Sequence, residues 1–590
     1  METMKTPGVY VVEKKAFPNS VVEVATAVPA FIGYTQKAEN GSQSLLKVPF
    51  RISSLMEFEK YFGGASYPQW DLINMDLLNK FLENVIPNDY PTEFQSKGVN
   101  ETLYKSLVEY RNSYSKALCS NASRIVVNNQ NYGLIKSQSS YTLYQHIKLF
   151  FANGGGSCYI VSVGTYGEAI EKDEFVKGIG TLEKEQEPTL LVIPEAVNME
   201  EQHCYEVYQQ MLSHCGEMKN RFAILDVHDG YKSDSTKIVN FREKIGDKYL
   251  NFGSVYYPWL TTSNVNLRFS MKDMISTDSV LYLIVQKSCT QNPVTMTREL
   301  SQFLVHYMYK TIDREKDQIN KEDLKNMVSF LIGYGDVEIK GQAEAGTEGT
   351  VYERVVAITK KELKELTDAE KTKLVEGWYS EEKDLISKLQ QLPLVPKVID
   401  LPPSAAMAGI YTMVDNTRGV WKAPANISIS AVISPTVDIT DEEQKDLNVP
   451  VNGKSVNAIR SFIGSGIKVW GARTLDGRDL NTRYINVRRT MIFLEESVKN
   501  AARSYVFEPN DANTWLNMKC MVENFLRSVW KRGGLVGASP EEAFSVHVGL
   551  GETMTPEDIL EGIMRISVLV AISHPAEFIE ITFQQQMQKS

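Results

Sequence analysis

The last strand-like stretch of this sequence has no neighbour to pair with, and this constrains the fold more than any other feature. Apolar and polar side chains alternate along it, as in a strand with one covered face. No tight turn joins it to an adjacent strand of its own chain. Because an isolated strand leaves its backbone N–H and C=O groups unpaired, we expect this stretch to add to the sheet of another chain. It consists of Phe578, Ile579, Glu580, Ile581, Thr582 and Phe583.

The start of the chain also contains strand-like runs without a neighbouring partner. A turn signal at residues 17–20 separates two β-rich runs, and neither run lies next to a sequence that could form a core with it. The expected strand residues are Val9, Tyr10, Val11 and Val12 in the first run and Val22 and Val24 in the second. We therefore expect an N-terminal arm over residues 1–28 that exchanges strands with a neighbouring molecule.

Two amphipathic helices are predicted before the terminal strand, over residues 489–505 and 514–532. Asn513 is the expected N-cap of the second helix, and Gly533 and Gly534 end it. In both helices the apolar residues recur at steps of three and four, which places them on one face. The predicted faces are Met491, Leu494, Val498, Ala501 and Tyr505, and then Trp515, Met518, Val522, Phe525 or Leu526, and Val529.

Composition narrows the class of protein. The chain has 590 residues and a net charge of −10, which disfavours a direct nucleic-acid binder because such proteins need a basic face. No apolar run is long enough for a transmembrane helix, and residues 1–16 lack the apolar core of a secretory signal. The six cysteines are sparse and irregularly spaced, as in reduced proteins. We expect a protein made in the cytoplasm without stable membrane insertion.

Motifs for phosphate binding are incomplete. Gly453, Lys454 and Ser455 match the end of a Walker A loop, but Asn448 stands where its first glycine is needed, and no strand precedes it. The glycines at residues 154–156 precede a strand instead of a helix N-terminus, so a helix-to-strand turn is the simpler interpretation. No cofactor is expected from either motif.

Two further groups of residues have side chains that occur in metal sites or catalytic sites. His203-Cys204 and His214-Cys215 share a helix face, but eleven residues rise about 16 Å, too far for one zinc ion. Asp226, His228 and Asp229 follow a predicted strand end, where α/β enzymes often carry catalytic groups, but the signal is weak and an ordinary turn at Asp229-Gly230 explains it adequately. We expect no metal site, and an α/β enzyme with a site at these three residues remains an alternative.

Short motifs occur in a fixed order from one end of the chain to the other. They are Thr6-Pro7-Gly8-Val9-Tyr10, the stretch at 150–155, Tyr256-Tyr257-Pro258-Trp259, Pro402-Pro403-Ser404, the stretches at 408–416 and 418–426, Ile485-Asn486-Val487-Arg488-Arg489, Phe507-Glu508-Pro509-Asn510 and Pro575-Ala576-Glu577-Phe578. In this order they resemble the contractile tail sheath proteins of bacteriophages and related contractile injection systems. Insertions near residues 65–140 and 261–399 depart from the family pattern.

The resemblance implies an α/β (α+β) multi-domain fold with mixed sheets flanked by helices, a peripheral inserted domain and extended terminal strand arms. The alternation of strands and helices over residues 158–260 favours the same class. The expected divisions are an arm at 1–28, a body at 29–260 with an insertion at about 65–140, an inserted outer domain at 261–400, a return to the body at 401–455, a tube-facing domain at 456–574 and an arm at 575–590.

For function, the resemblance implies a non-enzymatic subunit that polymerises as stacked hexameric rings around an inner tube and contracts from a metastable state. Its implied partners are further copies of the chain, the tube protein, and baseplate and terminator or cap proteins. It would be assembled in the bacterial cytoplasm for a phage tail or a cell-encoded injection particle. Glu496, Lys499 and Arg503, on the polar face of the first helix, are the candidate tube contacts. A non-contractile tail or baseplate component is a further alternative.

Overall fold

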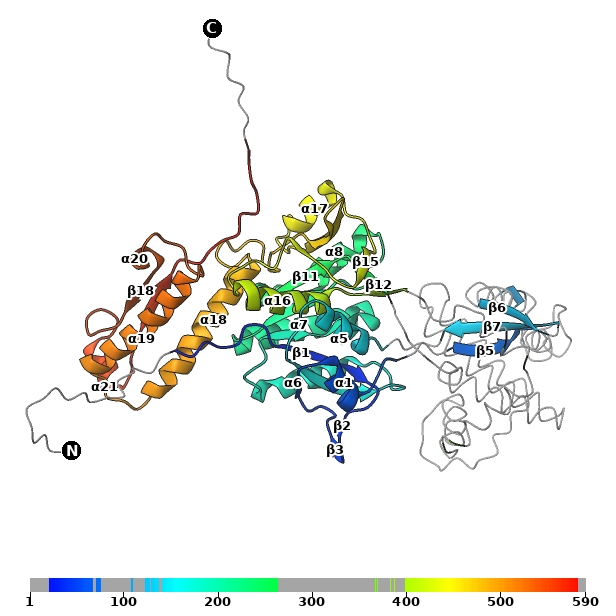
Figure 1. The fold of residues 1–590 in the computed structure, drawn as a ribbon, viewed down its shortest axis with the longest axis horizontal. Helices are drawn as coiled ribbons and strands as arrows, with labels where there is room; N and C mark the ends of the chain where they lie inside the picture. Colours follow the sequence, from blue (N-terminus) through cyan, green and yellow to red (C-terminus); the bar gives the residue numbers. More distant parts are fainter. Residues whose placement is uncertain are drawn as a thin grey trace, which may run out of the picture. The chain divides into compact units, whose positions relative to one another are not determined.

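A mixed sheet of nine strands forms the centre of the larger of two units into which contacts divide the chain (Figure 1). This is a computed structural model. It describes residues 21–66, 141–263 and 398–581 throughout, and residues 70–75, 105, 108–109, 123–127, 129–136, 367, 369, 383 and 387 outside them. The larger unit comprises Met1–Ser66, Tyr141–Ser263 and Val398–Ser590, and the smaller one Tyr67–Ser140 and Asn264–Lys397.

The middle of the large sheet is parallel and its two edges are antiparallel. Central strands such as β1 are buried along their full length, which is why they are nearly continuous apolar runs. The strands in sheet order are β14 (Ile427–Ser428), β17 (Gly466–Val469), β16 (Asn457–Phe462), β11 (Gly253–Tyr257), β10 (Phe222–Asp226), β9 (Leu190–Val192), β1 (Pro29–Thr35), β8 (Cys158–Thr165) and β4 (Phe50–Ile52).

Helices cover both faces of this sheet, each above its own apolar cluster. One face carries α6 (Lys172–Thr181), α7 (Glu201–Met218) and α8 (Ser235–Lys244), and the other carries α1 (Leu55–Phe62), α5 (Leu143–Ala152) and α16 (Ser404–Arg418). The α/β class expected from the sequence is confirmed. The shorter elements around the sheet are β2 (Glu39–Asn40), β3 (Gln43–Ser44), η1 (Leu182–Lys184), η2 (Pro194–Asn198), η3 (Leu250–Phe252), β12 (Leu260–Ser263), β13 (Val398–Leu401), β15 (Val432–Pro435) and α17 (Asp441–Asn448).

The boundary predicted at residue 456 is wrong. The strand β16 pairs in parallel with β11, so residues 457–469 complete the body sheet instead of opening a C-terminal domain. The apolar cluster of the C-terminal lobe instead takes in the second half of α18 and the elements that follow it. The lobe consists of α18 (Ile485–Ala502), η4 (Arg503–Tyr505), α19 (Ala512–Lys531), α20 (Pro540–Ala543), β18 (Phe544–His547), α21 (Pro556–Leu560) and β19 (Ser567–Val570).

The helix α19 follows its predicted pattern closely. Met518, Val522, Leu526 and Val529 are buried on one face. The N-cap is Asp511 and not Asn513, because its carboxylate accepts the N–H groups of residues 513 and 514 at 3.0 and 2.9 Å.

The face predicted for α18 is only partly right. Leu494 is buried as expected, but Met491 is only half-buried, whereas the polar Asn486, Arg489 and Ser497 are buried. This helix takes part in three apolar clusters through Ile485, Ile492 and Phe493. A helix that contacts the body and the lobe at once is covered on more than one side, and a single apolar stripe does not describe it.

The smaller unit has a described antiparallel sheet of three strands, in the order β5 (Trp70–Asn74), β7 (Gln130–Lys136) and β6 (Ser123–Val127). The smaller unit as a whole contains residues from both stretches in which the sequence departs from the family pattern. Their expected outer position stays a prediction.

Candidate functional site at the roots of the terminal arms

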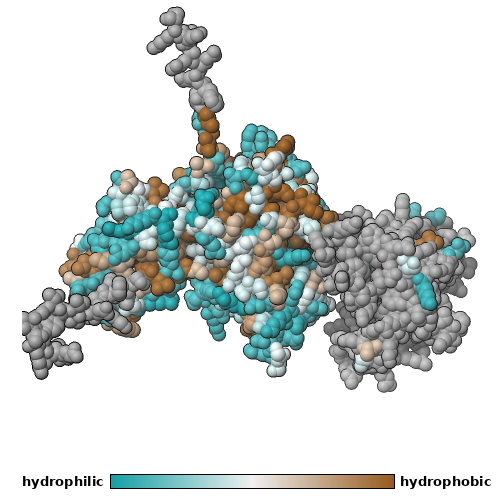
Figure 2. Space-filling view, in the orientation of Figure 1, coloured by the Kyte–Doolittle hydropathy of each residue, from teal (hydrophilic) through white to brown (hydrophobic). Residues whose placement is uncertain are grey.

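The C-terminal arm leaves the lobe after β19 as an extended chain. In the described part of the chain, residues 573–581 belong to no helix or strand and make no backbone–backbone hydrogen bond. Phe578, Ile579 and Ile581 are 75, 79 and 70% exposed, and this apolar stretch stands out in Figure 2. The expected strand therefore has no partner among the described residues of its own chain.

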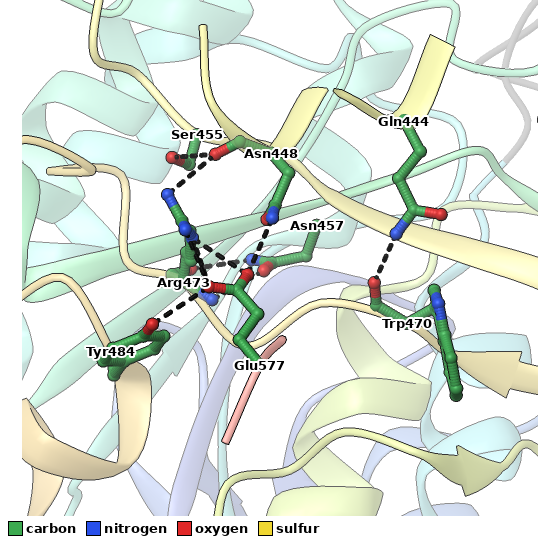
Figure 3. A network of polar contacts seen from close by, with 8 residues as sticks. All are labelled: Gln444, Asn448, Ser455, Asn457, Trp470, Arg473, Tyr484 and Glu577. Atoms are coloured by element: carbon green, nitrogen blue, oxygen red, sulfur yellow. Dashed lines mark hydrogen bonds and ion pairs between the residues drawn. The ribbon is translucent and has the colours of Figure 1, made fainter. Parts of the chain in front are cut away.

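Glu577 fixes the chain just before this exposed stretch (Figure 3). Its carboxylate receives Arg473 Nη2 at 2.7 Å and Nε at 3.0 Å, which is a bidentate ion pair. Asn448 Nδ2 donates to it at 2.7 Å and the Tyr484 hydroxyl at 2.9 Å. Arg473 is 3% exposed and Glu577 18%, so the pair is largely shielded from water.

The body sheet holds Arg473 in place. Asn457 on β16 accepts the Arg473 N–H at 2.7 Å and donates to the Val255 carbonyl of β11 at 3.1 Å. Arg473 Nη1 also donates to the Asn448 carbonyl at 3.2 Å. Burial alone would raise the pKa of Glu577, but the bonds from Arg473 and Asn448 outweigh it and keep that pKa below its usual value.

A groove of about 1020 Å³ opens beside this network. Trp421 and Trp470 line it together with Pro575 and Ile579 of the arm root. Trp470 is 38% exposed. The groove could therefore receive an apolar extended segment.

The root of the N-terminal arm is held mainly by side chains of the C-terminal lobe. Val24 N–H donates to Ser497 Oγ at 3.2 Å, and Arg489 Nη2 donates to the Thr26 carbonyl at 2.8 Å. Arg532 forms an ion pair with Glu23. In the described residues before β1 no strand is present, so the strand expected at Val22 and Val24 is not formed within this chain.

The arginine that holds Thr26 belongs to a buried ion pair. Arg489 Nη1 and Nη2 lie 3.0 and 2.6 Å from the two carboxylate oxygens of Asp415 on α16. The side chains are 3 and 2% exposed. The Arg489 guanidinium also lies 4.7 Å from the centre of the Tyr411 ring. This pair joins α16, α18 and the N-terminal arm.

The three candidate tube contacts differ in their surroundings. Glu496 pairs with Lys499 at 3.0 Å, but its side chain is only 14% exposed. Glu496 and Arg503 line a groove of about 430 Å³ together with body residues such as Phe222. Lys499, whose side chain is 55% exposed, is absent from that lining. A tube contact by these residues stays a prediction, and Lys499 and Arg503 are both exposed.

The remaining arm residues predicted from the sequence lie outside the described residues. They are Val9, Tyr10, Val11, Val12, Thr582 and Phe583.

The three residues of the alternative catalytic group contact other parts of the fold. Asp226 is 1% exposed and accepts the Ser404 N–H at 2.9 Å and the Ser404 hydroxyl at 2.5 Å, at the start of α16. His228 contacts the Met199 carbonyl at 2.9 Å. Asp229 pairs with Lys232 and Lys237 at 2.7 and 3.1 Å. Each of the three residues thus has a partner within the fold, while His228 Nδ1 is buried and makes no hydrogen bond to the described residues.

The side chains of the partial phosphate-binding motif also bind other residues of the protein. Lys454 Nζ donates to the Arg242 carbonyl at 2.8 Å and pairs with Asp247 at 2.9 Å. Ser455 Oγ donates to the Asn448 carbonyl at 2.8 Å. Over the described ranges, no helix is long and apolar enough to cross a bilayer, and no cluster of three potential metal ligands occurs.

Sequence reasoning gave no role to the residues that hold the arms. Glu577 lies in one of the motifs that carried the resemblance, and Asp415 and Arg489 lie in two others. Their partners are 104 and 74 residues away in the sequence, so spacing alone could not pair them. The motifs were the only signal that these positions mattered.

Comparison with known proteins defines the class. Residues 479–586, which include α18, α19 and the arm root, match the family model of the phage tail sheath C-terminal domain. Over 99% of its length the chain is similar to solved structures of contractile sheaths. Residues 479–586 thus resemble a tail sheath C-terminal domain, and the chain has the fold of contractile sheath subunits, as the sequence motifs predicted.

The individual relatives are phage and phage-like proteins. The chain is 28% identical to the tail sheath protein of Burkholderia phage BcepMu over 141 residues, and 24% identical to that of Vibrio phage KVP40 over 164 residues. These matches cover 23 and 27% of this chain and only 29 and 23% of the relatives.

The solved structures extend the likeness to the whole chain. The anti-feeding prophage helical sheath in its contracted state gives a TM-score of 0.53 at 23% identity, covering 99% of this chain and 100% of that one. The contracted sheath complex of the extracellular contractile injection system PVC gives 0.51 at 23%, covering 99% of each chain.

Proposed function

We propose that this chain is the subunit of a contractile sheath that polymerises with copies of itself around an inner tube. The observation that carries the proposal is the apolar extended segment from Phe578 to Ile581. It begins directly after the firmly held Glu577 and has no backbone hydrogen-bond partner among the described residues. The sheath C-terminal domain and the sheath fold support the same assignment.

The two arms connect each subunit to different neighbours by adding strands to their sheets. Main-chain hydrogen bonds of this kind do not require the packed faces between subunits to stay fixed. Contacts that are not closed on themselves generate an open helical polymer of stacked hexameric rings. The mesh of arms then keeps the rings together while the subunits move.

The strands β18 and β19 are the natural receivers of a neighbour's arm. They form a sheet of only two strands among the described residues, and such a sheet is marginal by itself in water. Leu569 on β19 is 60% exposed. Added strands would cover this surface and complete the sheet.

Contraction in this proposal releases a stored state, and no nucleotide is consumed. A few hundred Å² of extra apolar burial per subunit supplies several kcal/mol at about 25 cal/mol per Å². Summed over the subunits of a long sheath, this is enough to drive a tube through an envelope. The subunit acts as a structural protein, with the tube, baseplate and terminator or cap proteins as partners.

The surroundings of such a particle follow from the same proposal. The subunit assembles in the bacterial cytoplasm and becomes part of a phage tail or of a cell-encoded injection particle. Two of the similar solved structures are baseplate assemblies of the anti-feeding prophage, which keeps a baseplate-associated role as the second candidate.

Removal of the C-terminal arm tests the proposal. A chain lacking residues 578–590 should keep its thermal unfolding transition but form no striated tubes in negative-stain electron microscopy. A matched control is Glu580→Gln, which leaves the apolar positions of the arm intact and should assemble normally. Normal tubes from the shortened chain would refute the role of the arm, and discrete rings from the full chain would favour the baseplate role.

Lys499 is the residue with which to test tube binding. Lys499→Glu reverses an exposed charge beside Glu496 and should weaken cosedimentation of the extended sheath with its tube. Glu496→Lys and Arg503→Glu alter groove-lining residues and complete the series. Unchanged cosedimentation of all three variants would exclude this face of α18 as the tube contact.

A further inference from the structure

Side chains from the start of α18 to its middle contact the roots of both arms. On the C-terminal side, the hydroxyl of Tyr484, the N-cap of α18, donates to Glu577, and Asn486 Nδ2 donates to the Ser573 carbonyl at 3.0 Å. On the N-terminal side, Arg489 and Ser497 bind the backbone of residues 26 and 24. The two arms, at opposite ends of the sequence, thus meet on one helix.

This part of α18 is firmly embedded. Asn486 and Arg489 are 2 and 4% exposed, and Ser497 is fully buried. From residue 486 to residue 497 the helix rises about 16 Å, over which its backbone hydrogen bonds make it stiff. Asn486 also donates to the Trp421 carbonyl at 2.9 Å. The contacts therefore sit on a segment that does not deform easily.

Each root is fastened by a shielded ion pair. Glu577 is held by Arg473, in the segment between β17 and α18, and Thr26 is held by Arg489, which Asp415 orients from α16. Bidentate arginine–carboxylate pairs fix geometry as well as charge. Beyond these fastenings the described chain is exposed at Val22 and at Phe578. Movement of either arm relative to its subunit therefore begins outside residues 23–577.

We infer that α18 is a brace that joins the two arm roots, so that tension applied to one arm passes to the other through this helix as well as through the body sheet. The inference rests on the proposed sheath function, because only a meshed polymer pulls on both arms. It assigns Arg473, Glu577, Asn486 and Arg489 as positioning residues. Their role is to keep the spacing of the two roots constant while the subunit body changes its contacts.

The first test uses the full-length chain before assembly. A fluorophore introduced at residue 581 as a non-natural amino acid reports the mobility of the arm root. Glu577→Gln and Asn486→Ala should lower its anisotropy, and a cooperative thermal unfolding transition of each variant checks that the chain is still folded. Arg460→Lys is the matched control, because Arg460 lines the same groove but pairs with the exposed Asp441 and no arm residue. Anisotropy equal to that of the control would overturn the brace.

The second test uses sheaths contracted by mild denaturant. Glu577→Gln sheaths should break into contracted fragments several-fold shorter than those of the wild type and of Arg460→Lys. Fragments of wild-type length would overturn the inference. Failure of the wild-type chain to form sheaths would count against the proposed function instead, and the anisotropy measurement would still decide whether α18 fixes the arm root.

Discussion

In the described part of the chain, the carboxyl groups of Asp415, Asp226 and Glu195 are almost completely removed from water, and each is matched by a specific set of donors. Asp415 faces Arg489, Asp226 faces Ser404, and Glu195 accepts the N–H groups of residues 34, 142 and 143. Burial raises the pKa of Asp226 and of Glu195 to about 7, although these hydrogen bonds oppose the shift. Such groups fix the positions of helices more than they add stability, because desolvation offsets much of the attraction.

Asp226→Asn should change how stability depends on pH. The folded-state pKa of Asp226 is raised from 3.8 to about 7, so its contribution is fully present below about pH 4 and is lost as pH rises through 7. Relative to the variant, the wild type should therefore lose up to about 4 kcal/mol of unfolding free energy between pH 4 and 8. Chemical denaturation at several pH values measures this difference.

Asp229→Asn is the matched control for this experiment. The pKa of Asp229 is held below its usual value because hydrogen bonds from Lys232 and Lys237 outweigh burial. The wild type should therefore gain stability relative to this variant as pH rises from below pH 4. The same slope for both variants would contradict the assignment of Asp226 as a buried cap of α16.

The sequence identified Asp226 as noteworthy but could not identify its role. A polar residue at a strand end has the same local pattern whether it binds a substrate or caps a helix. Its partner Ser404 is 178 residues away and becomes a neighbour only when β10 and α16 pack together. The same holds for Glu577 and Arg473, whose pairing depends on the path of the chain after β19.

At the level of elements, the two helices of the C-terminal lobe differ in how well the sequence predicts them. The helix α19 packs one face into the apolar cluster of the lobe. The spacing of its apolar residues and its end before Gly533 were therefore predictable. The helix α18 buries Asn486, Arg489 and Ser497, because these side chains bind the arm roots. A hydrophobic pattern is blind to polar positions that are covered by other segments.

Gly533→Ala should destabilise the end of α19. Gly533 has a φ of +84°, a conformation that costs an L-residue about 1 kcal/mol, while no atom lies within 4 Å of an added Cβ. The effect is therefore one of backbone strain alone. Thermal unfolding should show a small fall in Tm, and the exposed Ser528→Ala on the same helix should show none. An unchanged Tm for Gly533→Ala would mean that the helix end relaxes without cost.

At the scale of the whole molecule, the order of motifs predicted the fold class and the sheath family, although no single motif was specific. The two units were harder to predict, since the smaller one combines residues 67–140 with residues 264–397. Nothing local in the sequence indicates that two distant insertions share a unit. For the arms, the alternating pattern predicts a strand, but the sheet that receives it belongs to another copy and is not encoded beside it in the sequence.

The strands on either side of the longer insertion make it removable. Ser263 at the end of β12 lies directly opposite Val398 at the start of β13 in an antiparallel pair. Two such ends can be joined by a two-residue turn such as Asn-Gly. A chain in which this turn replaces residues 264–397 should keep the unfolding transition of the larger unit. Loss of that transition in calorimetry would mean that the insertion is needed for folding.

The same pair of strand ends is a suitable site for inserting a foreign domain. A foreign domain whose own termini lie close together could be spliced between Ser263 and Val398 without stretching the host sheet, since the connection already leaves and re-enters at adjacent positions. In a polymer built from one kind of chain, every copy would then carry the guest. A genetic fusion at this point would turn the filament into a scaffold that displays enzymes or antigens at regular intervals.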